Sequence, residues 1–228
     1  NHDFSCENHD NLRRNGAFSE TRPDDLAAMT LRGLVEKSDI DPAEIDDVVM
    51  GCVTQIGEQG TNIARMAVLG AGFPVSVPGT TVNRLCASSL QSVNFAAQAV
   101  MSGQMSLTVG AGVESMTRIA MGSDVGPPSE KVTDRFEMVH QGVSAELMCE
   151  RYQLSRSWLD EISCISHERA LDARQSGYFN REILPVVVNR PDGTQASVQE
   201  DEGPRIGSTT EKLSRLKAAF KSDGLITA

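Results

Sequence analysis

Aromatic residues are scarce in this sequence, because phenylalanine, tyrosine and tryptophan together make up 4% of its 228 residues. The core must therefore be built mainly from alanine, valine, leucine, isoleucine and methionine. Basic residues are also outnumbered, with 21 Lys and Arg against 31 Asp and Glu, for a formal net charge of −10. Since nucleic-acid binding needs a basic face, this balance argues against a nucleic-acid partner. A small anionic ligand at a local basic cluster is still compatible with it.

Long apolar runs are missing as well. No run approaches the ~18 residues of a membrane-spanning helix. The first residues, NHDFSCENHDN, lack both the order of a secretory signal and the Arg-rich character of a transit peptide. The sequence does not begin with Met, so we expect the N-terminus to be incomplete. We expect a cytoplasmic protein without a membrane span, with an organelle matrix as the alternative location.

Cysteine pairs at metal-binding or redox spacing are absent. The five cysteines are Cys6, Cys52, Cys86, Cys149 and Cys164. They are odd in number, widely spaced and form no CxxC motif, which favours reduced thiols over a disulfide framework or a zinc site.

Strands and helices alternate along the first half of the sequence. Short apolar or β-branched runs that end at turn residues indicate strands, and apolar residues at helical spacing indicate helices. Strands are predicted over 48–53, 75–85 and 106–115. Helices are predicted over 23–37 and 62–72, and a further helix is predicted after Cys86. The helix faces expected to be buried carry Leu26, Met29 and Leu34; Ile63, Ala67 and Gly70; and Leu90, Val93, Ala97 and Val100. This alternation predicts an α/β domain over 1–117 with a largely buried sheet.

The second half, 118–228, is predicted to be a loop-rich module. Two helices are expected over 143–153 and 155–176, the second capped by Ser155 or Ser157. A strand over 182–188, a turn at 189–195 and a final helix over 209–220 complete the prediction.

The stretch VNRLCASSLQS, residues 82–92, places Cys86 where a strand is expected to end and a helix to begin. A thiolate attacks carbonyl carbon, and a helix N-terminus favours negative charge through its unpaired N–H groups and dipole. The same N–H groups would receive the oxyanion of a tetrahedral intermediate. Cys86 is therefore a candidate nucleophile, the alternative being an ordinary packing residue.

The same stretch, followed by GAGVESMTR at 110–118, resembles the nucleophile segment and next strand of the thiolases (acetyl-CoA C-acyltransferases and acetyl-CoA acetyltransferases). The resemblance covers nearly everything from about residue 12 onward, in family order. Further similar segments are RRNGAFS, TRPDDLAA, GCVTQIGEQGTNIAR, SAELMCERYQLSR, SHERALDA and STTEKLSRLKAAFKSDGLITA.

The resemblance implies a thiolase-like N-terminal half, a mixed sheet with helices on both faces, followed by a loop-rich α+β insertion on the CoA-binding side. It implies that Cys86 carries the acyl group in thiolysis of a 3-ketoacyl-CoA or in the reverse Claisen condensation. Coenzyme A is then a substrate, no metal or redox cofactor is needed, and the protein belongs to fatty acid and lipid metabolism. A homo-oligomer, dimer or tetramer, is expected.

The sequence departs from the family pattern at its end. The second-half motifs with a histidine, an asparagine and a second catalytic cysteine are not found, so we expect a partial chain. We expect the C-terminal catalytic half to lie outside these 228 residues, and the 228 residues alone are expected not to be competent. The alternatives are a non-catalytic thiolase-like fragment that serves CoA binding or assembly, and an unrelated α/β protein with a chance cysteine motif.

Three residues of the second module are candidates for CoA or substrate binding by resemblance. VHQGVSAE resembles the substrate-proximal stretch of biosynthetic members, which points to His140, with Gln141 where such members often have Met. Lys217 lies in a locally basic segment, 205–221, where the family often has an arginine near the nucleotide. The alternatives are an ordinary loop histidine and the solvated face of a final helix.

The remaining candidates are expected to be structural. Glu58 and Gln59 are expected to anchor their loop, and Glu114 to be a buried carboxylate held by backbone N–H groups rather than an acid or base. Cys52, Cys149 and Cys164 are expected to lie in or near the core.

Overall fold

The computed structural model describes residues 16–190 and 192–227, so the expected terminal loop lies mostly outside it, with Cys6. The chain forms two compact units. Of the described residues, the first unit contains 16–126 together with Leu184–Gln199, and the second contains Pro127–Ile183 and 200–227. The first unit thus extends beyond the predicted boundary at residue 117 and also takes in a segment from much later in the sequence.

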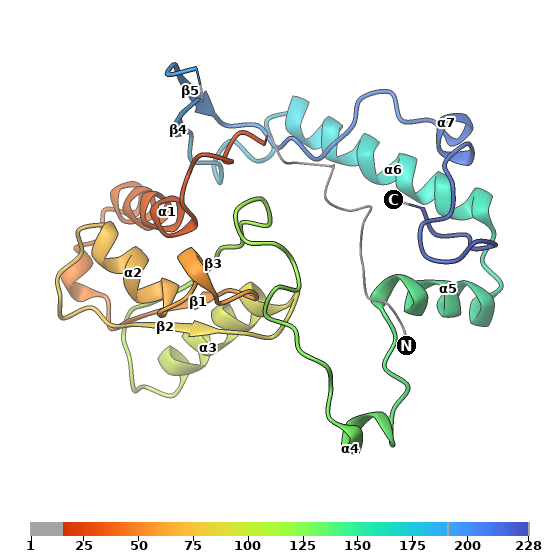
Figure 1. The fold of residues 1–228 in the computed structure, drawn as a ribbon. Coiled ribbons are helices and arrows are strands. Elements are labelled where there is room, and N and C mark those ends of the chain that lie inside the picture. The colour runs from red at the N-terminus through yellow and green to blue at the C-terminus, as the bar shows by residue number, and fades with distance from the viewer. Residues whose placement is uncertain (1–15, 191, 228) are drawn as a thin grey trace. The chain divides into compact units, whose positions relative to one another are not determined.

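The first unit is built on a parallel sheet (Figure 1). Its strands, in the order β2-β1-β3, are β1 (Asp47–Gly51), β2 (Gly79–Val82) and β3 (Thr108–Gly112). Val49 at the centre of β1 is in register with Thr80 on one side and with Gly110 on the other. The three strands of this sheet are all parallel, and an antiparallel hairpin forms a separate two-stranded sheet.

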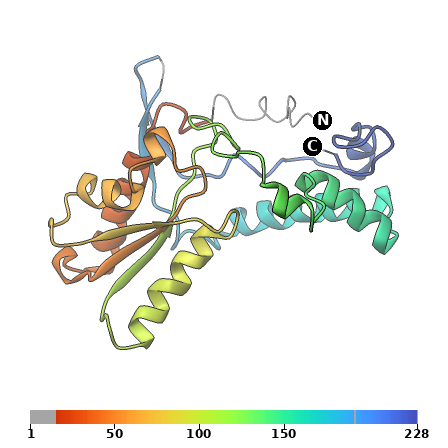
Figure 2. The ribbon, with the colours of Figure 1, turned by 60° about the horizontal axis from the view of Figure 1, so that its bottom comes forward.

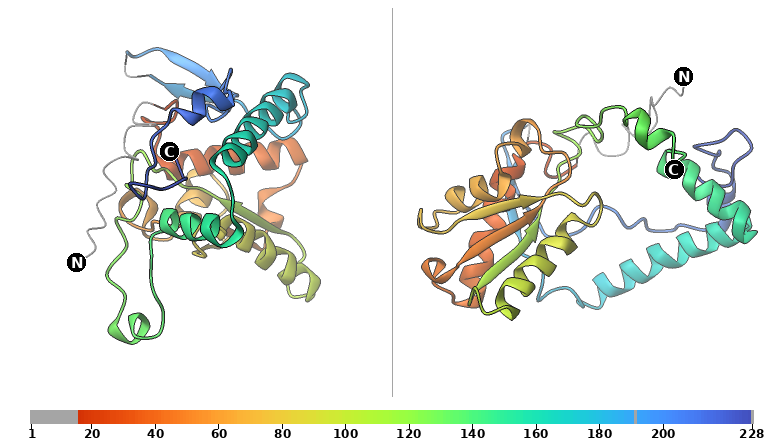
Figure 3. Two further views of the ribbon diagram at one scale, coloured as in Figure 1. Left: turned by 90° about the vertical axis from the view of Figure 1, so that its right-hand side faces the viewer. Right: turned by 90° about the horizontal axis from the view of Figure 1, so that it is seen from below.

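Helices cover both faces of this sheet, as predicted. α1 (Pro23–Ser38) and α2 (Ile63–Gly70) lie on one face and α3 (Ser88–Met101) on the other (Figure 3, right). The short 3-10 helices η1 (Pro42–Glu44) and η2 (Gly57–Gln59) lie in the connecting segments. α1 starts with a proline and two aspartates, which suit the positive end of a helix dipole, and ends at Asp39 in the left-handed conformation.

The hydrophobic core lies between the sheet and α1 and α2. Along β1, Val48 and Met50 point into it, and Val109 and Ala111 of β3 pack against it. The predicted faces of these helices were partly wrong. Leu34 of α1 is 42% exposed, whereas Leu31 and Val35 are buried. In α2, Ile63 and Ala67 are buried as predicted, but Gly70 is exposed.

The opposite face of the sheet contacts α3 through small residues. Ser88, Ser92 and Ala96 are the buried residues of α3, and the Ser92 hydroxyl donates to the Ala111 carbonyl oxygen at 2.6 Å. The predicted apolar face was therefore wrong. Its members lie on the exposed side of the helix: Leu90 is 65% exposed, Val93 49% and Val100 42%, and Ala97 is also exposed.

A two-stranded hairpin completes the first unit. It consists of β4 (Val186–Asn189) and β5 (Gln195–Val198), of which only the first strand was predicted. Just before it, Leu184 lies so close to Gly33 of α1 that a Cβ at residue 33 would meet the leucine side chain at 2.2 Å. This contact attaches the hairpin segment to α1, and the ribbon shows the hairpin segment running beside that helix (Figure 2).

The second unit is mainly helical. It contains α4 (Glu130–Thr133), α5 (Gln141–Tyr152), α6 (Arg156–Gln175) and α7 (Thr210–Ser214). α5 and α6 match the prediction, and Ser155 is the N-cap of α6, where it accepts from the Trp158 N–H at 3.2 Å. The final helix is much shorter than the predicted 209–220. Arg156 donates to the carbonyl oxygens of Leu213 and Leu216 and so satisfies acceptors where α7 ends.

The described ranges, 16–190 and 192–227, contain neither a membrane-spanning helix nor a metal-binding cluster. None of the helices there is both long and apolar enough to cross a membrane. Among the same residues, no group of three or more His, Cys, Asp or Glu side chains is placed to hold a metal ion.

Candidate active site at Cys86

Cys86 lies in the short turn between β2 and α3, at the carboxyl end of the parallel sheet. β2 ends at Val82 rather than at the predicted Leu85, and α3 begins at Ser88. Cys86 is exposed and comes directly before the helix N-cap, Ala87. The predicted position, between a strand and a helix, is therefore confirmed.

The turn holds one residue in an unusual backbone conformation. Leu85 has φ of 49°, in the left-handed region that non-glycine residues rarely adopt. The Asn83 side chain accepts from the Leu85 N–H at 2.8 Å through Oδ1. Its Nδ2 donates to the Val53 carbonyl oxygen at 2.9 Å, so the same side chain ties the turn to the chain that follows β1.

Ser88 closes the turn from the helix side. Its hydroxyl accepts from the Arg84 N–H at 2.9 Å and donates to the Leu85 carbonyl oxygen at 2.6 Å. The N–H groups of Ala87 and Ser88 donate to the carbonyl oxygens of Arg84 and Leu85. These two N–H groups are engaged within the turn, so they are not among the unpaired groups that the prediction reserved for an oxyanion.

Two glycines at the ends of β1 and β3 let the first turn of α3 approach the sheet closely. A Cβ at Gly51 would lie 2.3 Å from the Ser88 carbonyl carbon, and one at Gly112 would lie 1.8 Å from the Ser89 hydroxyl. Since real Cβ atoms do not tolerate such distances, the sheet must carry glycine at both positions. The residues that follow Cys86 thus pack directly against the ends of β1 and β3.

Glu114 organises the loop after β1. Its carboxylate accepts from the Val53 N–H at 2.7 Å, the Thr54 N–H at 3.3 Å and the Gln59 amide at 2.9 Å. The prediction that backbone N–H groups hold this carboxylate is confirmed, but the prediction of burial is wrong because the residue is exposed. Gln59 is fully buried and also accepts from the Ser115 N–H at 2.6 Å, as expected of a loop anchor.

Glu58 anchors the same loop through charge. Arg118 donates to it from Nε at 2.6 Å and from Nη2 at 2.7 Å, and Arg22 adds a contact at 3.2 Å. Hydrogen bonding to Arg118 lowers the pKa of Glu58. The predicted role of Glu58 as a structural residue of this loop is confirmed.

The cysteines differ sharply in environment. Cys52 and Cys149 are buried, as predicted, whereas Cys164 is partly exposed. Burial, reinforced by the charge of Glu114, raises the pKa of Cys52 to about 12. Burial also raises the pKa of Cys149. Among the cysteines of the described chain, Cys86 alone is exposed.

His140, Gln141 and Lys217 all belong to the second unit, whereas Cys86 belongs to the first. His140 is the N-cap of α5: its Nδ1 accepts from the Gly142 N–H at 3.1 Å, and its ring stacks on Phe220 with a centroid distance of 5.5 Å. This assigns the ring proton to Nε2. Gln141, the first residue of α5, and Lys217 are exposed.

The basic segment around Lys217 does not form the solvated helix face that was the alternative prediction, because α7 ends at Ser214. Several of its cations have local partners. Lys212 donates to the Gly207 carbonyl oxygen at 2.7 Å, Arg215 pairs with Glu211, and Lys221 pairs with Glu150 at 2.6 Å.

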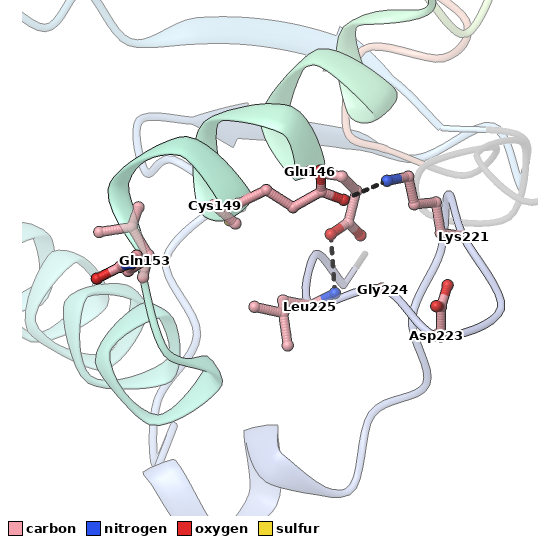
Figure 4. A pocket seen from close by; sticks show the side chains of 9 residues that line it. Glu146, Cys149, Gln153, Lys221, Asp223, Gly224 and Leu225 are labelled. Atoms are coloured by element: carbon pink, nitrogen blue, oxygen red, sulfur yellow. Dashed lines mark hydrogen bonds and ion pairs between the residues drawn. The ribbon is translucent and has the colours of Figure 1, made fainter.

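A cavity of about 340 Å³ lies in the second unit between α5 and residues 221–225 (Figure 4). Glu146 borders it, but its carboxylate accepts from the N–H groups of Leu225 and Ile226, both at 2.9 Å. Glu150 is paired with Lys221. The carboxylates of Glu146 and Glu150 thus hold the chain after Phe220 against α5.

Sequence reasoning missed Asn83, Ser88 and the two sheet glycines as supports of Cys86. Asn83 carried a usable signal, since an asparagine before a turn often bonds to the N–H two residues ahead. The roles of Gly51 and Gly112 depend on which strand lies under α3, and the sequence does not state that pairing.

Comparison with known proteins identifies the family. The model of the thiolase N-terminal domain matches residues 10–228. Proteins named probable acetyl-CoA acyltransferase, from Staphylococcus aureus (strain COL) and Staphylococcus epidermidis (strain ATCC 12228), are each 37% identical across 93% of this chain. The crystal structure of the Bacillus anthracis acetyl-CoA acetyltransferase superposes with a TM-score of 0.80 at 33% identity, covering 93% of this chain.

The chain spans 58% and 57% of the two staphylococcal relatives and 57% of the Bacillus chain. Within that span, the family match includes both the Cys86 turn and the helices of the second unit. The chain therefore belongs to the thiolase family.

Proposed function

We propose that the protein transfers acyl groups between acyl-CoA thioesters through an acyl-enzyme on Cys86. The observation that carries this proposal is the exposure of Cys86 in the turn between β2 and α3. The family match and the names of the relatives support the same activity.

In the degradative direction, the Cys86 sulfur attacks the keto carbon of a 3-ketoacyl-CoA. The bond between that carbon and its neighbour breaks, and acetyl-CoA leaves after its new methyl group takes up a proton. The sulfur of free CoA then attacks the acyl thioester, which returns a proton to Cys86 and releases a shortened acyl-CoA. In the synthetic direction the steps run in reverse: an acyl-CoA acylates Cys86 and releases CoA, and the methyl carbon of acetyl-CoA then loses a proton and attacks the acyl group. A thioester intermediate suits both directions.

The second unit would serve the CoA part of the substrate. His140 and Gln141 at the start of α5 would face the thioester, and Lys217 would meet the phosphates of the nucleotide. The exposure of Gln141 and Lys217 supports this assignment. The reaction as written needs no metal or redox cofactor. We further propose a cytoplasmic homo-oligomer that acts in fatty acid metabolism.

Thiolysis of acetoacetyl-CoA by the full-length natural protein that contains these 228 residues (the intact protein in all experiments below), followed as loss of substrate in the presence of CoA, tests the proposal. Cys86→Ala should abolish turnover, whereas Cys164→Ala, at a partly exposed position on α6, should retain it. Saturable CoA binding without any turnover in the unaltered protein would contradict catalysis and support the alternative of a CoA-binding thiolase-like protein.

A further inference from the structure

We infer that Asn83 is a positioning residue for Cys86, which it serves by holding Leu85 in the left-handed conformation. The inference rests on the proposed function, because the role concerns the reach of the Cys86 sulfur toward an acyl group. Asn83 is not expected to touch the substrate.

The conformation of Leu85 requires an external cause. With φ of 49°, this residue adopts a backbone conformation that side chains with a Cβ disfavour. Packing does not supply the cause, since the Leu85 side chain is 68% exposed. The hydrogen bonds of its peptide groups do, because Asn83 binds the Leu85 N–H and Ser88 binds the Leu85 carbonyl oxygen.

Asn83 also fixes the turn to the rest of the sheet. Its Nδ2 binds the Val53 carbonyl oxygen, and the Val53 N–H donates to Glu114 at 2.7 Å. Val53 follows β1, Asn83 follows β2, and Glu114 follows β3. The ends of all three strands are thereby linked to the turn through two side chains, and Asn83 is the link that contacts the turn itself.

The consequence concerns Cys86, the residue directly after Leu85. If Leu85 left the left-handed region, the following peptide would rotate and the sulfur would point elsewhere. The cysteine would still be exposed and nucleophilic, but it would no longer be aligned with a bound thioester. Misalignment of a nucleophile by about 1 Å is enough to slow its reaction by about 100-fold.

The experiment compares two reactions of Cys86 in the intact protein. Acetylation by acetyl-CoA requires alignment with a bound substrate, whereas alkylation by iodoacetamide requires only an accessible thiol. Both rates are read by peptide mass spectrometry, and the buried thiol of Cys52 reports unfolding if it becomes labelled. Asn94→Ala, at an exposed asparagine of α3, is the matched control.

Asn83→Ala is expected to lower acetylation of Cys86 by about 10- to 100-fold, with alkylation little changed and Cys52 protected. Asn83→Ser should show a smaller loss, because a serine hydroxyl can still accept from the Leu85 N–H. Adding Leu85→Gly to Asn83→Ala should recover part of the acetylation rate, since glycine adopts positive φ without a penalty.

If the unaltered protein is acetylated at Cys86 and Asn83→Ala is acetylated at the same rate, the inference about Asn83 is overturned but the proposed function is not. Absence of acetylation at Cys86 in the unaltered protein would overturn the proposed function and the role of Asn83 with it. If Asn83→Ala exposes Cys52 to labelling, the inference is decided by Asn83→Ser and by the double variant Asn83→Ala with Leu85→Gly. A slower acetylation in Asn83→Ser with Cys52 protected supports the role, and an unchanged rate contradicts it.

Discussion

Arg118 holds Glu58 with two nitrogen atoms, at 2.6 Å from Nε to Oε2 and 2.7 Å from Nη2 to Oε1. The two residues lie 60 positions apart, one in η2 after β1 and the other after β3. Arg118 also donates to the Ser19 carbonyl oxygen at 3.0 Å. This ion pair therefore joins three separate segments of the first unit.

Because the pKa of Glu58 is lowered in the folded protein, the ion pair stabilises the fold only while Glu58 is ionised. Glu58→Gln should cost about 1 kcal/mol in the free energy of unfolding at pH 7. The stabilisation is present above the ordinary pKa of 4.5 and is lost as the pH falls through the lowered value. Urea titrations between pH 3 and pH 7 should therefore show the two proteins converging on the acid side. A difference that is constant with pH would contradict the ionic account.

Gly51→Ala should destabilise the first unit by about 1–3 kcal/mol, because the added Cβ would lie 2.3 Å from backbone atoms of Ser88. Gly126→Ala is the matched control, since a Cβ there would meet nothing within 4 Å. Thermal melts of both variants provide the comparison. Equal stability of the two would show that α3 moves away from β1 at no cost.

The exposed apolar face of α3 should promote association between copies of this chain. Leu90 and Val100 are 65% and 42% exposed, and large apolar surfaces exposed to water drive association. Replacing both residues by glutamine should lower the weight-average molecular mass that analytical ultracentrifugation measures at micromolar concentration. The same pair of changes at Leu147 and Met148 of α5, which are also exposed, serves as the control. A monomer that behaves identically with and without the α3 changes would refute this prediction.

The four described cysteines should alkylate in the order of their exposure and thiolate availability. Cys86 should react first with iodoacetamide near pH 7, and acetyl-CoA should slow it. Cys52, with a pKa of about 12, should react last, because almost none of its sulfur is ionised at that pH. Cys6 lies outside the described residues and is left out of the ranking. Cys86 labelling no faster than Cys149 or Cys164 would oppose its role as nucleophile.

The sequence was sufficient to predict the order of the main elements. β1, β3, α2, α5 and α6 lie within a few residues of their predicted ranges, because apolar periodicity and capping residues are local signals. The position of Cys86 before α3 followed from the same signals.

The buried face of α3 was mispredicted because it depends on what lies beneath it. The sheet presents Gly110 and Gly112 to this helix. The serine and alanine face of α3 therefore packs against the sheet, and the larger residues of the helix lie on its exposed side. The short α7 is a similar case. The Leu213 carbonyl group near its end accepts from Arg156, 57 residues earlier in the sequence. Local periodicity carries no information on that contact.

The residues that support the Cys86 turn were likewise predicted only in part. Glu114 was correctly expected to bind backbone N–H groups. Its exposure was not foreseen, and neither was the link from Asn83 to Val53 across 30 residues. Such links require the strand order, which single-sequence patterns do not contain.

The most direct test of the account is to identify the acylated residue. The intact protein is incubated with acetyl-CoA without a second substrate, quenched in acid, and its peptides are mapped by mass spectrometry. The account predicts one acetyl group on Cys86, removed by added CoA with regeneration of acetyl-CoA, and no acetylated cysteine in Cys86→Ser. Acetylation at another cysteine, or an acetyl group on Cys86 that CoA does not remove, would contradict it.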